Sequence, residues 1–257
     1  MKNIAIITGA SSGMGREFAL TAADHGQFDE IWCIARNKAN LENLRGQINA
    51  VVKPMPLDLT KPESFEVIKQ ELRKEELNVK LLINASGFGI FDSFMETSWE
   101  DIEGMIDLNT KAVVRMTKLV LPYMQYGSRM MHISSMAAFQ PTPYMDIYRA
   151  TKAFVLSFSR ALNSELESKG IQSMAVCPYW TKTAFFERAV QEGKAPVVKK
   201  YVVMYRPEKI IKKAWKDLSK GKDVSIYGLV ANGQAALCKL LPHRTVMNIW
   251  KHQQKLR

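Results

Sequence analysis

Short apolar runs alternate with helical patterns along most of this chain, and this alternation limits the possible folds more than any other feature. The runs read as six strands and a weaker seventh: 3–8, 30–35, 51–57, 80–85, 128–135, 171–177 and 223–228. Helical patterns lie between them, at about 14–25, 40–49, 62–75, 99–125 and 147–168. Strands this apolar, each followed by a helix, predict a parallel sheet covered on both faces. With right-handed crossovers, the fold class is α/β, a doubly wound parallel sheet of about seven strands.

Composition excludes several classes of protein. The chain is 47% hydrophobic and 24% charged, as is usual for a soluble globular protein. Cys33, Cys177 and Cys238 are far apart in sequence, so neither a disulfide framework nor a metal site is expected, and a reducing, cytoplasmic location fits best. The first apolar run is too short for a signal peptide, and no segment approaches the ~18 apolar residues of a membrane span.

The positive charge is concentrated near the C-terminus. Residues 194–257 contain 15 Lys and Arg against 3 Asp and Glu, whereas residues 1–193 contain 21 against 22. Solvated lysines on helices explain such an excess, but so would contact with an anionic membrane surface, an acidic ligand or nucleic acid. No nucleic-acid-binding module accompanies the charge, and we therefore expect no nucleic-acid partner.

A glycine-rich turn, TGASSGMG, follows the first strand and precedes a helix. Ligands of doubly wound sheets bind beyond the carboxyl ends of the strands, which is where this turn lies. Glycines allow close approach of the backbone to a pyrophosphate, and the helix N-terminus offers free N–H groups. No Lys-Ser/Thr pair follows, which argues against a triphosphate-binding loop. We expect the turn to bind a dinucleotide through Gly9, Ser11, Ser12, Gly13, Met14 and Gly15.

The ends of strands two and three carry a second set of candidates. Arg36 stands where an acid would bind a ribose 2′-hydroxyl, with Lys38 nearby. Because a guanidinium suits a 2′-phosphate, the sequence favours NADP(H) over NAD(H). After strand three, Asp58 could bond to the adenine amine, and Leu59 follows it. Thr60, three residues before Glu63, could also cap the next helix.

The stretch YRATK places a phenol and an ammonium four residues apart. In a helix, Tyr148 and Lys152 lie on one face, one turn apart. A cation there favours the phenolate and lowers a pKa that starts near ~10. Ser135 precedes Tyr148 by thirteen residues and directly follows strand five. Tyr148, with Lys152 beside it, is therefore a candidate proton donor, and Ser135 lies where the sheet is expected to carry function.

Taken in order, these motifs resemble those of the short-chain dehydrogenase/reductase family, in its single-domain branch of roughly 250 residues. The match runs from residue 3 to about 228. Its motifs here are Thr8 to Gly15, Asn84-Ala85-Ser86-Gly87, Asn109, Ser135, Tyr148 with Lys152, Pro178-Tyr179 and Thr183. Two departures occur: Ala85 replaces the family's second asparagine, and Tyr179 replaces a glycine.

The resemblance implies a Rossmann-like domain over residues 1–228 that binds NADP(H) and carries catalysis, with residues 229–257 as a basic helical extension of the same domain. It implies Tyr148 as general acid and base, Lys152 as the group that lowers its pKa and holds the nicotinamide ribose, and Ser135 as the partner of the substrate carbonyl. Asn109 would hold a water that relays protons to Lys152. The cofactor-binding set then also includes Asn84, Ala85, Tyr148, Lys152, Pro178, Thr181 and Thr183.

The segments after strands four to six are rich in large apolar side chains: Phe88, Phe91, Met136, Phe139, Tyr144, Tyr179, Trp180, Phe185 and Phe186. Together they favour a bulky hydrophobic ketone or secondary alcohol over a sugar; steroids, bile acids, long acyl chains and xenobiotic ketones all remain possible. The resemblance also implies a homodimer or homotetramer. A non-catalytic protein that senses NADP(H) is the alternative function.

The C-terminal segment is the least typical part. A helical stripe is followed by Pro242 and a second short basic helix containing Trp250; the stripe consists of Leu229, Val230, Gly233, Leu237, Leu240 and Leu241. Basic, amphipathic, tryptophan-bearing segments can lie on a membrane surface. Packing against a second subunit, a cover over the substrate mouth or another partner are the other possibilities.

Overall fold

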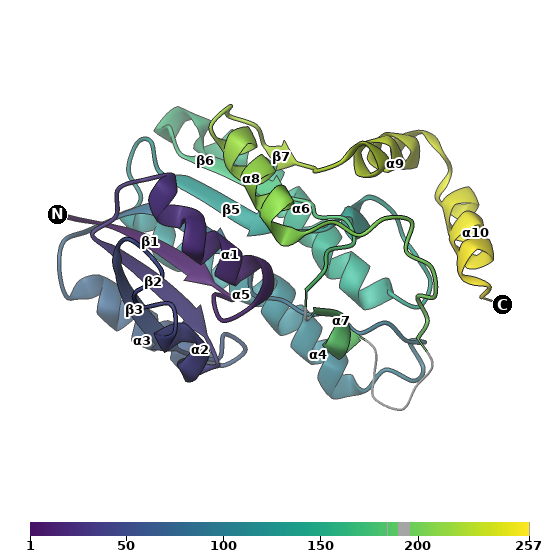
Figure 1. Ribbon diagram of the computed structural model, residues 1–257, viewed down its shortest axis with the longest axis horizontal. Coiled ribbons are helices and arrows are strands. Elements are labelled where there is room, and N and C mark those ends of the chain that lie inside the picture. Colours follow the sequence, from purple (N-terminus) through teal and green to yellow (C-terminus); the bar gives the residue numbers. More distant parts are fainter. Residues whose placement is uncertain (184, 190–195, 257) are drawn as a thin grey trace.

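The structure, a computed structural model, describes residues 1–183, 185–189 and 196–256. Within them, a seven-stranded sheet forms the centre of the molecule, with the strand order β3-β2-β1-β4-β5-β6-β7 and every neighbouring pair parallel (Figure 1). The strands are β1 (Lys2–Thr8), β2 (Glu30–Ala35), β3 (Val51–Pro56), β4 (Leu77–Asn84), β5 (Arg129–Ile133), β6 (Gln172–Val176) and β7 (Val224–Ser225). This confirms the doubly wound parallel sheet.

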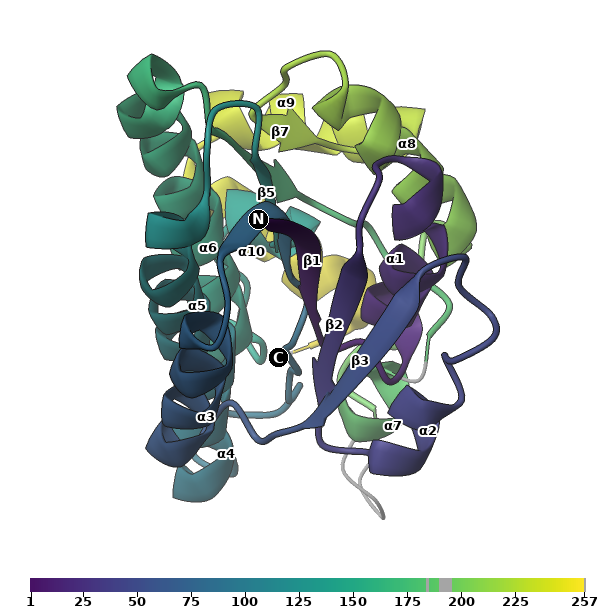
Figure 2. The ribbon, with the colours of Figure 1, turned by 90° about the vertical axis from the view of Figure 1, so that its left-hand side faces the viewer.

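Helices cover both faces of the sheet, as Figure 2 shows from its edge. On one face lie α3 (Pro62–Arg73), α4 (Trp99–Ile106), α5 (Ala112–Val120) and α6 (Asp146–Leu166); on the other lie α1 (Gly13–Thr21), α2 (Lys38–Glu42) and α8 (Pro207–Leu218). A short helix, α7 (Phe185–Ala189), follows β6.

Successive side chains of β1 enter two different cores. Ile4 and Ile6 pack with α3, α5 and α6, whereas Ala5 and Ile7 pack with α1, α2 and α8. All four are fully buried. The period of two is that of a strand, and burial on both faces explains why the run is apolar throughout. Full burial of an isoleucine side chain contributes about 1.5–3 kcal/mol, so this strand stabilises both layers at once.

Several helix boundaries differ from those predicted. The helix expected over 40–49 is α2, which Asn37 starts by accepting from the Asn40 N–H at 3.0 Å and which ends at Glu42; Gly46, with φ +79°, lies in the turns that follow. The single helix expected over 99–125 is interrupted by one π-helical turn, Asp107–Lys111. Helix α8 was not predicted, although Ile210, Ile211, Ala214, Trp215 and Leu218 recur at helical spacing and are buried.

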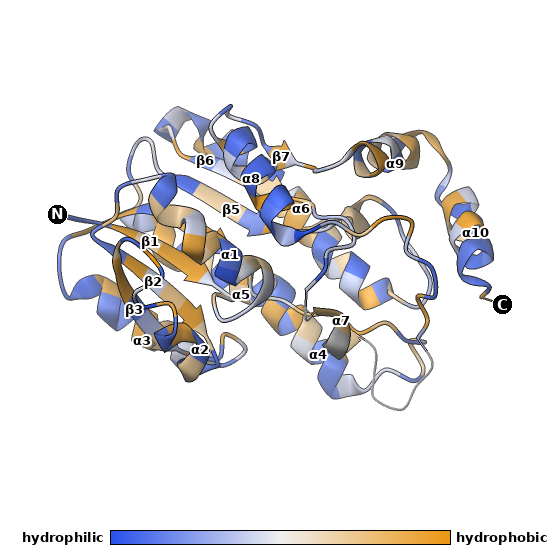
Figure 3. Cartoon of the chain, in the orientation of Figure 1, coloured by the Kyte–Doolittle hydropathy of each residue, from blue (hydrophilic) through white to orange (hydrophobic). Residues whose placement is uncertain are grey.

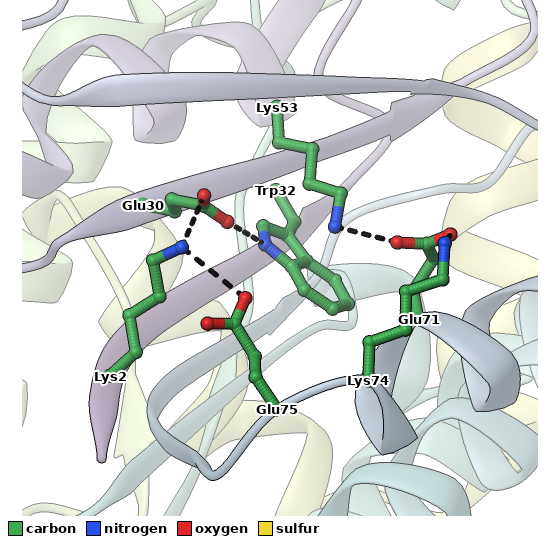
Figure 4. A network of polar contacts seen from close by, with 7 residues as sticks. All are labelled: Lys2, Glu30, Trp32, Lys53, Glu71, Lys74 and Glu75. Atoms are coloured by element: carbon green, nitrogen blue, oxygen red, sulfur yellow. Dashed lines mark hydrogen bonds and ion pairs between the residues drawn. The ribbon is translucent and has the colours of Figure 1, made fainter.

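A polar network lies at the amino ends of β1 and β2 and beside β3 (Figure 4). The buried Trp32 indole donates to Glu30 at 2.8 Å, and Lys2 pairs with the same carboxylate at 2.7 Å. Lys53 sits 4.0 Å from the centroid of the Trp32 ring and pairs with Glu71 of α3 at 2.9 Å. The network fastens α3 to the sheet at the end away from the carboxyl edge.

Two helices extend past β7 toward one end of the molecule (Figure 1): α9 (Leu229–Leu240) and α10 (His243–Gln254). Part of the predicted leucine stripe faces away from the rest of the chain, since Leu229 is 92% exposed and Leu240 is 82% exposed. The inward face of α9 is made by smaller side chains, Ala231, Ala235 and Cys238. Figure 3 shows the hydrophobic colour of α9 at this end. None of the helices in the described ranges is long and apolar enough to cross a bilayer.

Candidate active site

A cavity of about 1080 Å³ lies at the carboxyl edge of the sheet and extends to α9 and α10. It is slightly larger than the roughly 300–1,000 Å³ usual for ligand sites, so it has room for more than one small molecule. Most of the residues predicted for the site line it: Gly9, Ser11, Ser12, Gly13, Met14, Gly15, Arg36, Asp58, Leu59, Ala85, Ser135, Tyr148, Lys152, Pro178, Thr181 and Thr183. Asn84 and Asn109 do not.

The glycine turn is built so tightly that side chains would not fit. A Cβ on Gly15 would lie 2.3 Å from the Gly9 carbonyl oxygen, and one on Gly9 would lie 2.9 Å from the Ala85 backbone. Gly9 and Gly13 have φ values of +69° and +53°. Glycine is therefore required both for space and for the backbone conformation.

The N-terminus of α1 faces this turn, and no capping side chain accepts hydrogen bonds from its first backbone N–H groups. Its N-cap, Ser12, makes no side-chain cap bond, and the first turn carries no acidic residue. Thr8, which the sequence prediction left out of the site, braces the turn: its hydroxyl accepts from the N–H groups of Ala85 and Ser86 at 3.0 and 3.1 Å. The donor set suits a pyrophosphate, so the residues present fit a dinucleotide.

Arg36 and Asp58 stand together at the next strand ends. Arg36 is exposed and has no hydrogen-bond or ion-pair partner among the described residues. Burial opposes ionisation of Asp58, but hydrogen bonds from the backbone and side chain of Thr60, and the charge of Arg36, lower its pKa. The predicted cap at Thr60 is wrong, because its hydroxyl donates to Asp58 at 2.8 Å and Lys61 is the N-cap of α3.

Tyr148 and Lys152 lie one turn apart on α6, as predicted, and both are buried. The Lys152 Nζ is 5.7 Å from the centroid of the Tyr148 ring and donates to the Ile133 carbonyl oxygen at 2.9 Å. Ser134 donates to the Lys152 carbonyl oxygen at 2.7 Å, tying β5 to α6. The Ser135 hydroxyl accepts from the Ala137 N–H at 3.0 Å and is also hydrogen-bonded to the Tyr148 phenol.

Burial, rather than the neighbouring ammonium, dominates the acidity of the phenol. Burial raises the pKa of Tyr148 to about 12, against the lowering effects of Ser135 and of the Arg149 charge. Burial also lowers the pKa of Lys152 to about 8. The lowered phenol pKa expected from Lys152 is therefore not found in this structure. The phenol is a protonated group at neutral pH, which suits a proton donor.

Asn109 lies in the π-helical turn, with both atoms of its amide occupied. Its Oδ1 accepts from the Phe88 N–H at 3.0 Å, and its Nδ2 donates to the Phe88 carbonyl oxygen at 2.8 Å and to Thr151 at 3.1 Å. A Cβ on Gly87 would lie 2.9 Å from Asn109 Oδ1 and 3.2 Å from Lys152 Nζ, so these groups surround Gly87 closely. Asn109 fixes the loop after β4; its part in a water relay stays a prediction.

Asn84 joins elements of the core and does not line the cavity. Its Nδ2 donates to Thr117 of α5 at 3.3 Å and lies 3.1 Å from Nδ1 of His132 on β5. These contacts place its side chain between the sheet and a helix, and the predicted contact of Asn84 with the cofactor stays a prediction. The next residue, Ala85, lines the cavity instead.

The other end of the cavity is aromatic. Seven of the nine predicted residues line it: Phe88, Phe91, Met136, Tyr179, Trp180, Phe185 and Phe186. Phe139 and Tyr144 do not. The Tyr148 ring packs between Phe91 and Phe185, with ring centroids 5.7 and 5.5 Å away. Tyr179 takes the family's glycine position without a positive φ, so the replacement leaves the backbone unstrained there.

Helix α10 closes this end of the cavity through residues that sequence reasoning did not assign to the site. The Trp250 ring stacks on Trp180 at a centroid distance of 6.5 Å and donates to the Pro143 carbonyl oxygen at 3.3 Å. The fully buried Gln254 bonds to the backbone of Lys199 and Lys200. Only the tryptophan in a basic helix signalled this contact in the sequence. In the described ranges, no three His, Cys, Asp or Glu side chains are grouped to hold a metal ion.

Comparison with known proteins yields consistent similarities. A family model described as short chain dehydrogenase matches residues 3–194. The mouse 17-beta-hydroxysteroid dehydrogenase type 3 is 35% identical over 188 residues, which are 70% of this chain and 60% of that protein. The bovine very-long-chain 3-oxoacyl-CoA reductase is 31% identical across 95% of this chain and 78% of its own length. A short-chain dehydrogenase from Sphingobium yanoikuyae, solved in complex with NADPH, is 28% identical with a TM-score of 0.76, covering 94% of this chain and 97% of that one.

Proposed function

We propose a specific activity for this chain, which belongs to the short-chain dehydrogenase/reductase family and is an oxidoreductase that acts on CH–OH and C=O groups with NAD(P)(H). It interconverts a bulky hydrophobic ketone and the corresponding secondary alcohol, with NADP(H) as the cofactor. The observation that carries this proposal is the meeting of Ser135, Tyr148 and Lys152 in one cavity whose adjoining wall is aromatic.

The cofactor preference rests on Arg36. Its guanidinium lies at the cavity end nearest β2 and β3, free to make charge-assisted bonds to a 2′-phosphate. The glycine turn and the N-terminus of α1 would hold the pyrophosphate, and Pro178, Thr181 and Thr183 line the cavity after β6. The nicotinamide supplies the hydride when the cofactor is bound.

The chain's own groups handle the proton and the substrate carbonyl. Tyr148, protonated at neutral pH, donates its hydroxyl proton to the carbonyl oxygen during reduction. Ser135, hydrogen-bonded to the phenol, orients that oxygen. Lys152 keeps its ammonium beside the phenol through its bond to the Ile133 carbonyl oxygen, so that negative charge developing on Tyr148 meets a cation. Asn109 holds the Phe88 backbone in place around this group.

The aromatic wall supports a large apolar substrate. Phe91 and Phe185 contact the Tyr148 ring, and Trp180 continues the surface toward Trp250 of α10. Steroid and acyl ketones deserve the first trials, since a hydroxysteroid dehydrogenase and a 3-oxoacyl-CoA reductase are among the relatives.

The test is a spectrophotometric measurement of NADPH consumption with steroid, bile-acid, acyl and aromatic ketones. With a ketone that is turned over, Tyr148→Phe should lower kcat about 10²–10⁴-fold, because the general acid is lost. The affinity for NADPH, measured by fluorescence titration, should change less than about threefold, since packing of the ring is kept.

Tyr126→Phe is the matched control, because Tyr126 is 84% exposed and lies outside the cavity lining. It should retain full activity. Wild-type rates in Tyr148→Phe would contradict the assigned acid. NADPH binding without turnover of any ketone in the panel would favour the regulatory alternative.

The proposal extends to assembly, location and domain organisation. The exposed leucines of α9 suit contact with a second copy of the chain in a homodimer or homotetramer. Sedimentation velocity with Leu229→Ser and Leu240→Ser tests this, and binding to anionic vesicles in place of self-association would assign the face to a membrane.

Residues 1–228 serve as the catalytic domain with 229–257 as its extension, and a cytoplasmic location is checked by cell fractionation.

A further inference from the structure

Arg149, the residue after Tyr148, is a buried cation in the wall of the substrate cavity. It is only 6% exposed, and it lines the cavity with the residues its guanidinium touches: Ala137, Gln140, Met145 and Trp250. One residue on from Tyr148, a helical side chain points about 100° around the axis. The guanidinium therefore lies beside the reacting groups, on the side closed by α10.

The protein satisfies this guanidinium poorly. Nη1 donates to the carbonyl oxygens of Ala137 and Gln140, each at 3.4 Å, and the nearest partner of Nη2 is the Met145 thioether at 3.9 Å. Nε is buried and has no partner. The guanidinium carbon is 5.5 Å from the centroid of the Trp250 ring. Five N–H donors are thus left with two long hydrogen bonds and a sulfur contact.

No carboxylate in the described part of the chain offsets this charge. Among the described residues, the titratable groups that act on Arg149 are Tyr148, Cys238 and Tyr179. Burial raises the pKa values of all three, so they are neutral near pH 7. The Cys238 thiol is itself a donor, to Oε1 of Gln140. Burial of a cation without a partner anion is unfavourable, and such groups are normally paired.

We propose that Arg149 binds a carboxylate of the substrate, so that the preferred substrates are hydrophobic keto acids and the corresponding hydroxy acids. This rests on the proposed function, because it places the reacting carbonyl at Ser135 and Tyr148. A planar guanidinium can donate two parallel hydrogen bonds to the oxygens of a carboxylate. Nη2, whose partner here is the Met145 thioether, keeps donor capacity for that contact, and Nε has no hydrogen-bond partner.

The role of Arg36 differs from that of Arg149. Arg36 is exposed at the cavity end near β2 and β3, whereas Arg149 is buried with Gln140, Tyr179 and Trp250 on the side of α9 and α10. The two cations would therefore select charges on two different molecules, the nucleotide and the substrate.

The test compares acids with their neutral esters. Benzoylbutyrate and its methyl ester are titrated into the full-length protein saturated with NADP⁺, by calorimetry, and are then assayed as substrates with NADPH. The wild-type protein should bind the acid more tightly. Arg149→Gln should weaken acid binding by about 10- to 100-fold, as loss of charged hydrogen bonds does, and leave ester binding within about threefold.

Two further variants separate recognition from folding. Arg160→Gln alters an exposed arginine of the same helix, which pairs with Asp223, and should leave the acid-to-ester ratio unchanged. Arg149→Lys keeps the charge but loses the paired hydrogen bonds, so the ratio should fall below that of the wild type even if Arg149→Gln does not fold.

Equal binding of acid and ester by the wild type would overturn the inference. So would an equal loss of both ligands in Arg149→Gln, or an unchanged ratio in Arg149→Lys. The proposed function fails separately: if neither acid nor ester is reduced while acid binding still depends on Arg149, the carboxylate site stands and the turnover assignment does not.

Discussion

Arg36 distinguishes two dinucleotides by charge at a single position. Arg36→Asp places a carboxylate where the 2′-phosphate would bind, so the KM for NADPH should rise at least about tenfold more than the KM for NADH. Initial rates with both cofactors measure this. Arg45→Asp makes the same charge change at an exposed arginine outside the cavity lining, and should affect both cofactors little. An equal effect of Arg36→Asp on NADPH and NADH would refute the preference for NADP(H).

Single residues were predictable where a fixed spacing carried the chemistry. Tyr148 and Lys152 follow from a four-residue helical interval, and the glycine turn follows from its place after the first strand. Arg149 sits inside the same motif, but its burial depends on α10, more than ninety residues later in the chain. The side-chain partners of Asn84, Thr117 and His132, could not be predicted for a related reason, since they come from distant elements.

At the scale of elements, the sheet was predictable and the helix ends were less so. Continuous apolar runs identify buried strands directly. The π-helical turn at Asp107–Lys111 could not be foreseen, because no residue type requires it; it exists where Asn109 bonds across to Phe88 and Thr151. The fourth strand begins at Leu77, three residues earlier than predicted, and its pairing with β1 shifts register between Ile4 and Ala5.

Strand β5 carries a buried histidine that makes stability depend on pH. Burial lowers the pKa of His132 to about 4, whereas an unfolded histidine titrates near 6.5. The stabilising contribution is complete above about pH 6.5, is lost as the pH falls toward 4, and amounts to roughly 3 kcal/mol. Denaturant unfolding of the wild type between pH 7 and 4 should show this loss.

His132→Gln provides the comparison, since glutamine cannot titrate and its carbonyl can still accept from Asn84. The variant should be less stable at pH 7 but should show a shallower fall in unfolding free energy between pH 6.5 and 4. The lowered pKa values of Glu30 and Glu71 add a loss at lower pH in both proteins. Parallel pH curves would remove His132 as the cause.

At the scale of the whole molecule, closure of the substrate cavity depends on how α10 is attached. Gln254 accepts from the N–H groups of Lys199 and Lys200 at 2.8 and 2.9 Å and donates to the Lys200 carbonyl oxygen at 2.9 Å. Gln254→Ala removes these three part-buried hydrogen bonds, each with a net contribution of about 0.5–1.5 kcal/mol, and should loosen α10. The KM for a bulky ketone should rise about 3- to 10-fold, whereas the KM for NADPH should not change.

His252→Ala is the matched control, because His252 is an exposed neighbour on the same helix. It should leave both KM values unchanged. Limited proteolysis should cleave Gln254→Ala faster near α10 than either the control or the wild type. If Gln254→Ala raised both KM values equally, the loosening would not be confined to the substrate end.

Two separate parts of the fold, β5 with α6 and α9 with α10, serve catalysis and substrate binding, and this separation affects how substrate selectivity can change. The groups that move the proton come from the first pair, while the second supplies a separate wall over them. Exchanging that wall for one from another member of the lineage would change which molecules are admitted without altering the reaction. Directed evolution of new selectivity should therefore start at the inner surface of α10, where substitutions would contact the substrate but not the catalytic residues.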